Sequence, residues 1–141
     1  MRYWDTSAIL PLLVDEPARD RLIALHREDS QMLAWWGTPV EMASAISRRE
    51  REGRISSAAA DAALQAAKRL AAAWHEVVPS DAIRRMAERL LRVHPLRAAD
   101  SLQLSAALAA ASHDPATLEM VCLDERLTAA ARREGFVVIE A

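Results

Sequence analysis

Short runs of strand-forming residues alternate with longer stretches of helical periodicity along the chain. This alternation indicates parallel strands joined by crossover helices, because a parallel pair needs a long connection between its strands. The predicted fold class is therefore α/β with a mainly parallel sheet. Five strands are expected, at Arg2–Asp5, Met32–Trp36, His75–Val78, Met120–Leu123 and Val137–Glu140.

Capping and helix-breaking residues predict where the helices begin and end. Thr38-Pro39-Val40-Glu41 fits a capping box, in which a threonine cap and a glutamate three residues later satisfy each other's backbone N–H groups. Ser7 is likewise expected to cap the first helix. The expected helices are Ala8–Val14, a segment from Asp15 to about Arg27, Thr38 up to Gly53, Ser56 to about Ala73, Ser80 to Val93, Leu96–Ser112, and a last helix that ends at Glu134 before Gly135.

Length and composition limit the class of protein. At 141 residues the chain is expected to form one domain, residues 1–141, with a buried core. A hydrophobic fraction of 52% with only three glycines and six prolines excludes a disordered chain. Cys122 is the only cysteine, so no intrachain disulfide can form, and its side chain is expected to pack as a small hydrophobic group. No signal peptide or bilayer-spanning apolar run is recognisable, so we expect a cytoplasmic protein without membrane contacts.

Four acidic residues lie where predicted strands end or predicted helices begin. Asp5 and Asp124 follow the first and fourth strands, Glu41 lies in the turn after the second strand, and Asp100 lies in the first turn of the long helix. In a doubly wound parallel sheet these points lie on the same edge. Four carboxylates are therefore expected to converge there.

Each acid also has a purely structural interpretation. Glu41 alone is better explained as the partner in a capping box, Asp124 can cap the last helix, and Asp100 can complement the dipole of its helix. Asp5 is harder to explain by packing, since it closes a strand that should be covered on both faces. These interpretations explain the acids singly and leave their shared edge unexplained.

A cluster of carboxylates needs a cation. Two like charges about 4 Å apart repel by about 4 kcal/mol at an effective dielectric constant of 20. Oxygen ligands without a nearby histidine or cysteine pair favour Mg²⁺, with Mn²⁺ as the alternative, over zinc. The predicted metal ligands, which are also the predicted catalytic residues, are Asp5, Glu41, Asp100 and Asp124. The histidines show no metal-ligand spacing and are expected at the surface or in loops: His26, His75, His94 and His113.

A Mg²⁺ or Mn²⁺ site of this kind can activate water and hold a phosphodiester for in-line attack. Phosphoryl-oxygen chemistry is therefore the leading functional prediction. Thr6 and Ser7 join the candidate catalytic residues because they could orient a water or a phosphate, although capping a helix is the more frequent role of such residues.

Basic residues give a weaker indication of a nucleic-acid surface. The net charge of −2 provides no bulk attraction to polyanions, so any such surface must be local. Arg48 lies seven positions after Glu41 on the same helical stripe. A contact with an RNA backbone and a solvated arginine face are equally weighted interpretations of Arg48, Arg49, Arg51 and Arg54.

The four tryptophans are numerous for a chain with one phenylalanine and one tyrosine. We expect them to pack in the core. A dimer or partner groove formed by Trp36, Trp74 or Met86 is the alternative.

Four short segments surround the acids: Tyr3-Trp4-Asp5-Thr6-Ser7-Ala8, Val40-Glu41-Met42-Ala43-Ser44-Ala45, Ala99-Asp100-Ser101-Leu102-Gln103-Leu104 and Cys122-Leu123-Asp124-Glu125-Arg126-Leu127. In order and spacing these segments resemble the PIN domain, and the overall size is similar to that of a VapC-type toxin ribonuclease of a type II toxin–antitoxin system. The resemblance covers essentially the whole chain. Each segment alone is weak, but four in order are fairly specific.

The resemblance implies a three-layer α/β/α sandwich, Mg²⁺- or Mn²⁺-dependent endoribonuclease activity, and a homodimer. It also implies a small cognate antitoxin that inserts a segment near the active site and co-represses its operon. By position it assigns the same acidic quartet, with Thr6 or Ser7 as the accompanying hydroxyl. The family often has threonine or serine two residues before the last acid, where this chain has Cys122, so Asp124 ranks below the other three acids.

Two alternatives stay open beside the toxin ribonuclease: a PIN ribonuclease of ordinary RNA turnover, and a catalytically silent partner-binding module of the same fold. Two phosphoryl-transfer domains are disfavoured. A haloacid-dehalogenase type needs a second acid where Ser7 stands, and a receiver type needs a lysine after a late strand, whereas Lys68 is the only lysine.

Overall fold

Five parallel strands form one sheet, in the order β3-β2-β1-β4-β5, in the computed structural model, which describes residues 1–141. All five predicted strands are present, each one or two residues shorter than predicted. The predicted α/β class with a parallel five-stranded sheet is thereby confirmed. The strands are β1 (Arg2–Trp4), β2 (Met32–Trp35), β3 (His75–Val77), β4 (Met120–Val121) and β5 (Val138–Ile139).

The predicted helices are also present, with ends that shift by up to about four residues. Ser56 and Ser80 cap their helices through the side chain, as expected. Gly135 ends the last helix at a φ of 104°, in the left-handed region that favours glycine. The helices are α1 (Thr6–Leu13), α2 (Arg19–Glu28), α3 (Thr38–Arg51), α4 (Ser57–Ala71), α5 (Asp81–Val93), α6 (Ala98–Ala110) and α7 (Glu125–Glu134), with a short 3₁₀ turn at Pro115–Thr117.

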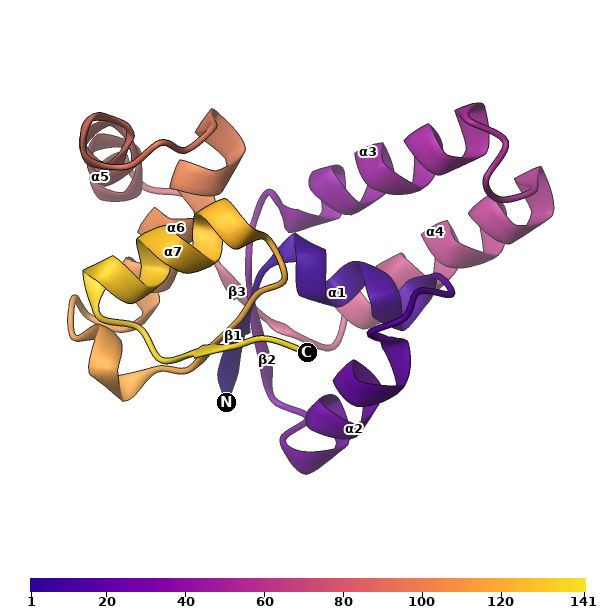
Figure 1. Cartoon of the computed structure of the whole chain (residues 1–141), viewed down its shortest axis with the longest axis horizontal. Helices are drawn as coiled ribbons and strands as arrows, with labels where there is room; N and C mark the ends of the chain where they lie inside the picture. The colour runs from indigo at the N-terminus through magenta and orange to yellow at the C-terminus, as the bar shows by residue number, and fades with distance from the viewer.

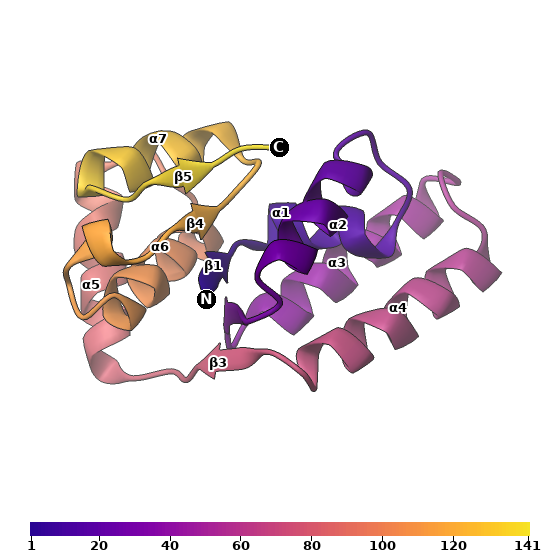
Figure 2. The same ribbon diagram turned by 90° about the horizontal axis from the view of Figure 1, so that it is seen from below.

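Helices cover both faces of the sheet, which explains why its strands are apolar on both sides. Successive strand residues point to opposite faces: buried Tyr3 packs with the residues of α5, α6 and α7, whereas buried Trp4 packs with those of α1 to α4. Figure 1 shows these two helical layers on either side of the strands. Figure 2 shows the α3–α4 pair extending away from the sheet.

The strand order places a topological switch point between β1 and β4. From central β1 the chain proceeds outward to β2 and β3, and it later returns to the other side of β1 to form β4 and β5. In such sheets the crevice at the carboxyl ends of the two strands is open to ligands. Asp5 directly follows β1, so it lies at this crevice.

Several predictions about buried side chains are settled by the packing. Trp4, Trp35 and Trp74 are buried as expected, but Trp36 is 54% exposed. Because Trp74 packs in the core, it is not available to a surface groove. His94 lies in the loop that follows α5, one of the two placements expected for the histidines, but it is 5% exposed and not a surface residue, with Nε2 2.6 Å from Glu134 Oε1. None of the helices is both long and apolar enough to cross a membrane.

Candidate active site

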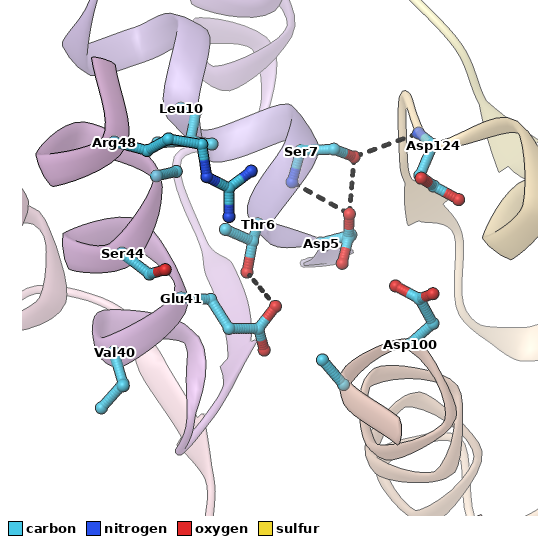
Figure 3. A pocket seen from close by; sticks show the side chains of 12 residues that line it. Asp5, Thr6, Ser7, Leu10, Val40, Glu41, Ser44, Arg48, Asp100 and Asp124 are labelled. Atoms are coloured by element: carbon cyan, nitrogen blue, oxygen red, sulfur yellow. Dashed lines mark hydrogen bonds between the residues drawn. The ribbon is translucent and has the colours of Figure 1, made fainter. Parts of the chain in front are cut away.

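The four predicted acids line one pocket of about 510 Å³ at the switch point. They arrive from four different parts of the fold: the end of β1, the first turns of α3 and α6, and the loop after β4. Figure 3 shows their carboxylates facing the same space. The polar and charged residues that line the pocket are Asp5, Thr6, Ser7, Glu41, Ser44, Arg48, Asp100 and Asp124.

Asp5 is held by Ser7 and caps α1 itself. Its Oδ2 accepts hydrogen bonds from Ser7 N at 2.9 Å and from Ser7 Oγ at 2.5 Å. Ser7 Oγ in turn accepts from the backbone N–H of Leu123 at 2.9 Å and of Asp124 at 3.2 Å. The prediction that Ser7 caps the first helix is therefore wrong, because its hydroxyl joins the end of β1 to the loop after β4.

Glu41 is held by two side chains from other elements. Thr6 Oγ1 donates to Glu41 Oε2 at 3.2 Å, and Gln103 Nε2 lies 3.1 Å from Glu41 Oε1. The predicted capping box is absent: Gly37 is the N-cap of α3, and the Thr38 hydroxyl accepts from Gln103 instead. Glu41 is thus available to the pocket and has no helix-capping role.

Asp100 and Asp124 combine a helix-capping contact with their place in the pocket. The backbone N–H of Arg97 donates to Asp100 Oδ2 at 3.3 Å, at the start of α6. Asp124 is the N-cap of α7, with its Oδ1 accepting from Leu127 N at 2.8 Å. For these two acids the structural interpretation and the shared pocket are both correct.

Burial and mutual repulsion disfavour the charged forms of these carboxylates. Burial raises the pKa of Glu41 to about 7, and the charge of Asp5 adds to the shift against the hydrogen bonds from Gln103 and Thr6. Burial also raises the pKa of Asp5, opposed by the contacts with Ser7 and reinforced by Asp100. The pKa of Asp100 is raised by burial and by Asp124. Ionising all the carboxylates together is therefore unfavourable in the protein alone, and a bound cation would offset that cost.

The donor set suits a hard divalent cation. All four carboxylates offer oxygen, and none of them forms an ion pair with a basic side chain. No three histidine, cysteine or acidic side chains are gathered closely enough to hold one ion together. Mg²⁺ usually keeps several water ligands and is bound directly by only one or two protein carboxylates, so a partly hydrated ion would suit this set of oxygen donors.

Two residues at the site were not identified from the sequence as interacting partners of the acids. Gln103 is completely buried in α6, and its side chain contacts Glu41. In the sequence, only its position as a polar residue between Leu102 and Leu104 of an apolar helix indicated that Gln103 could have a specific buried partner.

Cys122 is buried as predicted, and its Sγ lies 3.8 Å from Asp5 Oδ2. Burial raises its pKa to about 12, so the thiol stays neutral.

Arginines lie on both sides of the carboxylates. Arg48 lines the pocket itself, whereas Arg49 pairs with Glu16 on the neighbouring surface. A second cleft of about 520 Å³ shares Ala99, Asp100 and Asp124 with the first pocket. Exposed Arg97 and Arg126 line this second cleft, and neither forms an ion pair. The acidic pocket is thus bordered by cationic groups able to contact phosphates.

Comparison with known proteins supports the architecture. No protein-family model and no curated protein sequence matches the chain. The crystal structure of FitAcB from Neisseria gonorrhoeae is similar with a TM-score of 0.67 and 14% identity, covering 99% of this chain and 96% of that one. The structure of FitAB bound to an IR36 DNA fragment is similar with a TM-score of 0.69 and 12% identity, covering 99% and 94%. At these identities the likeness concerns the fold, and it confirms the predicted three-layer α/β/α sandwich with a parallel five-stranded sheet.

Proposed function

We propose that this chain is a Mg²⁺- or Mn²⁺-dependent endoribonuclease that hydrolyses RNA phosphodiester bonds, and that it acts as the toxin of a toxin–antitoxin pair. One observation carries the proposal: four carboxylates from four separate elements line one pocket without a basic partner. Such a cluster is electrostatically unfavourable in the protein alone, and it becomes favourable with a bound divalent cation.

Asp5, Glu41, Asp100 and Asp124 are the proposed ligands, one or two of them binding directly and the others through water molecules on the ion. A bound Mg²⁺ or Mn²⁺ would lower the pKa of a water molecule and neutralise charge on the substrate phosphate. Thr6 and Ser7 act on the carboxylates, since each donates its hydroxyl proton to one of them. Thr6 holds Glu41 and Ser7 holds Asp5, which orients both acids toward the pocket.

The arginines support a polyanionic substrate. A phosphodiester strand laid across the carboxylates would place neighbouring phosphates near Arg48 on one side and near Arg97 and Arg126 on the other. The choice of RNA over DNA rests on the resemblance of the four acidic segments to PIN ribonucleases.

The partners follow from the same resemblance. FitAB, whose fold is similar, is described in complex with a DNA fragment, and we propose that this chain also enters a DNA-binding complex, with a small antitoxin. We also propose that the chain forms a homodimer, as the same resemblance implies.

The direct test incubates the purified chain with single-stranded RNA oligonucleotides and Mg²⁺ or Mn²⁺. We expect internal cleavage that stops when EDTA removes the metal and resumes when Mn²⁺ is added in excess, because the carboxylates cannot hold the scissile phosphate without a cation. Products are separated on denaturing gels. Cleavage that persists in EDTA, or intact RNA at every metal concentration, would reject the proposal.

Replacing Arg97 and Arg126 together by glutamine should weaken RNA binding and reduce its salt dependence. Each lost contact with a single-stranded phosphate lowers the slope of log affinity against log salt by about 0.7. The measurement is fluorescence anisotropy of a labelled oligonucleotide across a salt series. Arg92→Gln, which changes an exposed arginine at the end of α5, is the matched control. An unchanged salt slope in the double variant would remove the second cleft from the substrate path.

A further inference from the structure

Gln103 lies at the centre of a buried hydrogen-bond network behind the carboxylates. Its Nε2 lies 3.1 Å from each of three acceptors, Thr6 Oγ1, Thr38 Oγ1 and Glu41 Oε1. Its Oε1 accepts from the Tyr3 hydroxyl at 2.7 Å. The side chain is completely buried and belongs to α6, one turn after Asp100. One carboxamide therefore joins β1, α1, α3 and α6.

Tyr3 holds the oxygen end of the carboxamide. Burial raises the pKa of Tyr3 well above its usual value, so the phenol keeps its proton and donates to Gln103 Oε1. The ionised Glu41 carboxylate, which is the form that would bind a cation, can only accept hydrogen bonds, so Nε2 and not Oε1 faces it.

We propose that Gln103 is a positioning residue that sets the spacing between Glu41, Asp5 and Asp100 and thereby the metal affinity of the pocket. It touches neither the substrate phosphate nor the cation, and it acts through Glu41 and Thr6. The inference rests on the proposed function, because it assumes that the carboxylates bind a cation.

The geometry explains why a carboxamide is needed. Two N–H groups serve three acceptors, and they connect the helix that carries Asp100 to the Glu41 carboxylate and to Thr6, which directly follows Asp5. Without them Glu41 keeps only the hydrogen bond from Thr6. Its carboxylate can then rotate away from the other acids, so a cation would lose a preorganised ligand.

The test measures Mn²⁺ binding to the full chain by electron paramagnetic resonance titration of the free ion. Gln103→Met keeps the length and volume of the side chain but removes both N–H donors. We expect it to weaken Mn²⁺ binding by about 10- to 100-fold, the range found when groups that orient metal ligands are removed.

Ser105→Ala is the matched control. Ser105 is buried on the same helix and donates to Ile83 O at 2.7 Å, on the α5 side and away from the pocket. The Ser105→Ala variant also loses one buried hydrogen bond. Its stability should therefore fall about as much as that of Gln103→Met, while its Mn²⁺ affinity stays at the wild-type value. Melting curves measure the loss of stability for both variants.

Tyr3→Phe provides a second variant, which also serves if Gln103→Met does not fold. It leaves the carboxamide in place but removes the hydrogen bond that holds its Oε1, so we expect a several-fold weaker Mn²⁺ affinity. If Tyr3 acts through Gln103, the double variant should bind Mn²⁺ no more weakly than Gln103→Met alone.

The outcomes separate this inference from the proposed function. Wild-type affinity in both Gln103→Met and Tyr3→Phe, or an equal loss in Ser105→Ala, overturns the role of Gln103 and leaves the nuclease proposal standing. A wild-type chain that binds no Mn²⁺ overturns both. Reduced affinity in the two network variants, with an unchanged control, supports the inference.

Discussion

Asp5→Asn is expected to reduce metal-dependent RNA cleavage by at least about 100-fold, because changing even a residue that only supports a metal ligand can cost this much. Asp5 is 4% exposed and lies at the end of the central strand, where its carboxylate faces the pocket. Cleavage rates under single-turnover conditions measure the loss.

The same substitution should raise the melting temperature of the metal-free protein. The raised pKa of Asp5 shows that its surroundings disfavour the carboxylate, despite the two hydrogen bonds from Ser7. Asparagine keeps an oxygen that can accept from Ser7 N and removes the repulsion with Asp100. Asp61→Asn, at an exposed position of α4, is the matched control and should change neither property. Full cleavage by a folded Asp5→Asn variant would exclude Asp5 from the chemistry.

The stability of the metal-free protein is expected to fall as the pH rises from about 5 to 8, relative to a Glu41→Gln variant. The pKa of Glu41 is raised from 4.5 to about 7 in the folded protein, so the folded state holds this proton more tightly than the unfolded chain. The resulting stability is fully present below pH 4.5 and is lost as the pH passes through 7. This raised pKa corresponds to a loss of at most about 3 kcal/mol in the free energy of unfolding between low and high pH. The partial exposure of Glu41 makes the expected loss smaller.

Glutamine resembles the protonated glutamate, so the two proteins should be similarly stable at pH 5 and differ most at pH 8. Thermal melts across this range, in EDTA, measure the difference. Mn²⁺ should reverse the trend in the wild type, since binding at 100 times the dissociation constant stabilises by about 2.7 kcal/mol and displaces the Glu41 proton. Parallel pH profiles for the two proteins, or melting temperatures indifferent to millimolar Mn²⁺, would contradict the shared carboxylate site.

The elements of the fold were predictable because their signals are local. Apolar runs and helical periodicity identified all five strands and all seven helices, and Gly135 marked the end of α7 by its need for a left-handed backbone. The shared edge of Asp5, Glu41, Asp100 and Asp124 followed from one topological rule, that the carboxyl ends of parallel strands meet.

The roles of individual oxygens were not predictable, because local and distant partners compete for the same atom. Thr38 and Glu41 fit a capping box in sequence, yet both side chains bind Gln103, which lies 65 and 62 positions away. Ser7 fits a helix cap, yet its hydroxyl accepts from Leu123, 116 positions away. A helix end can use solvent or another residue, whereas a buried carboxylate needs a specific donor.

The sequence by itself determined the α/β architecture and the identity of the four acids, since both depend on residue type and spacing along the chain. Only the tertiary structure decided that Thr6 and Ser7 hold Glu41 and Asp5, that His94 is buried, and that Gln103 joins four elements behind the pocket. The physical reason is that a hydrogen bond is directional over about 3 Å, so its partner is chosen by the packing of distant segments, which no local pattern encodes.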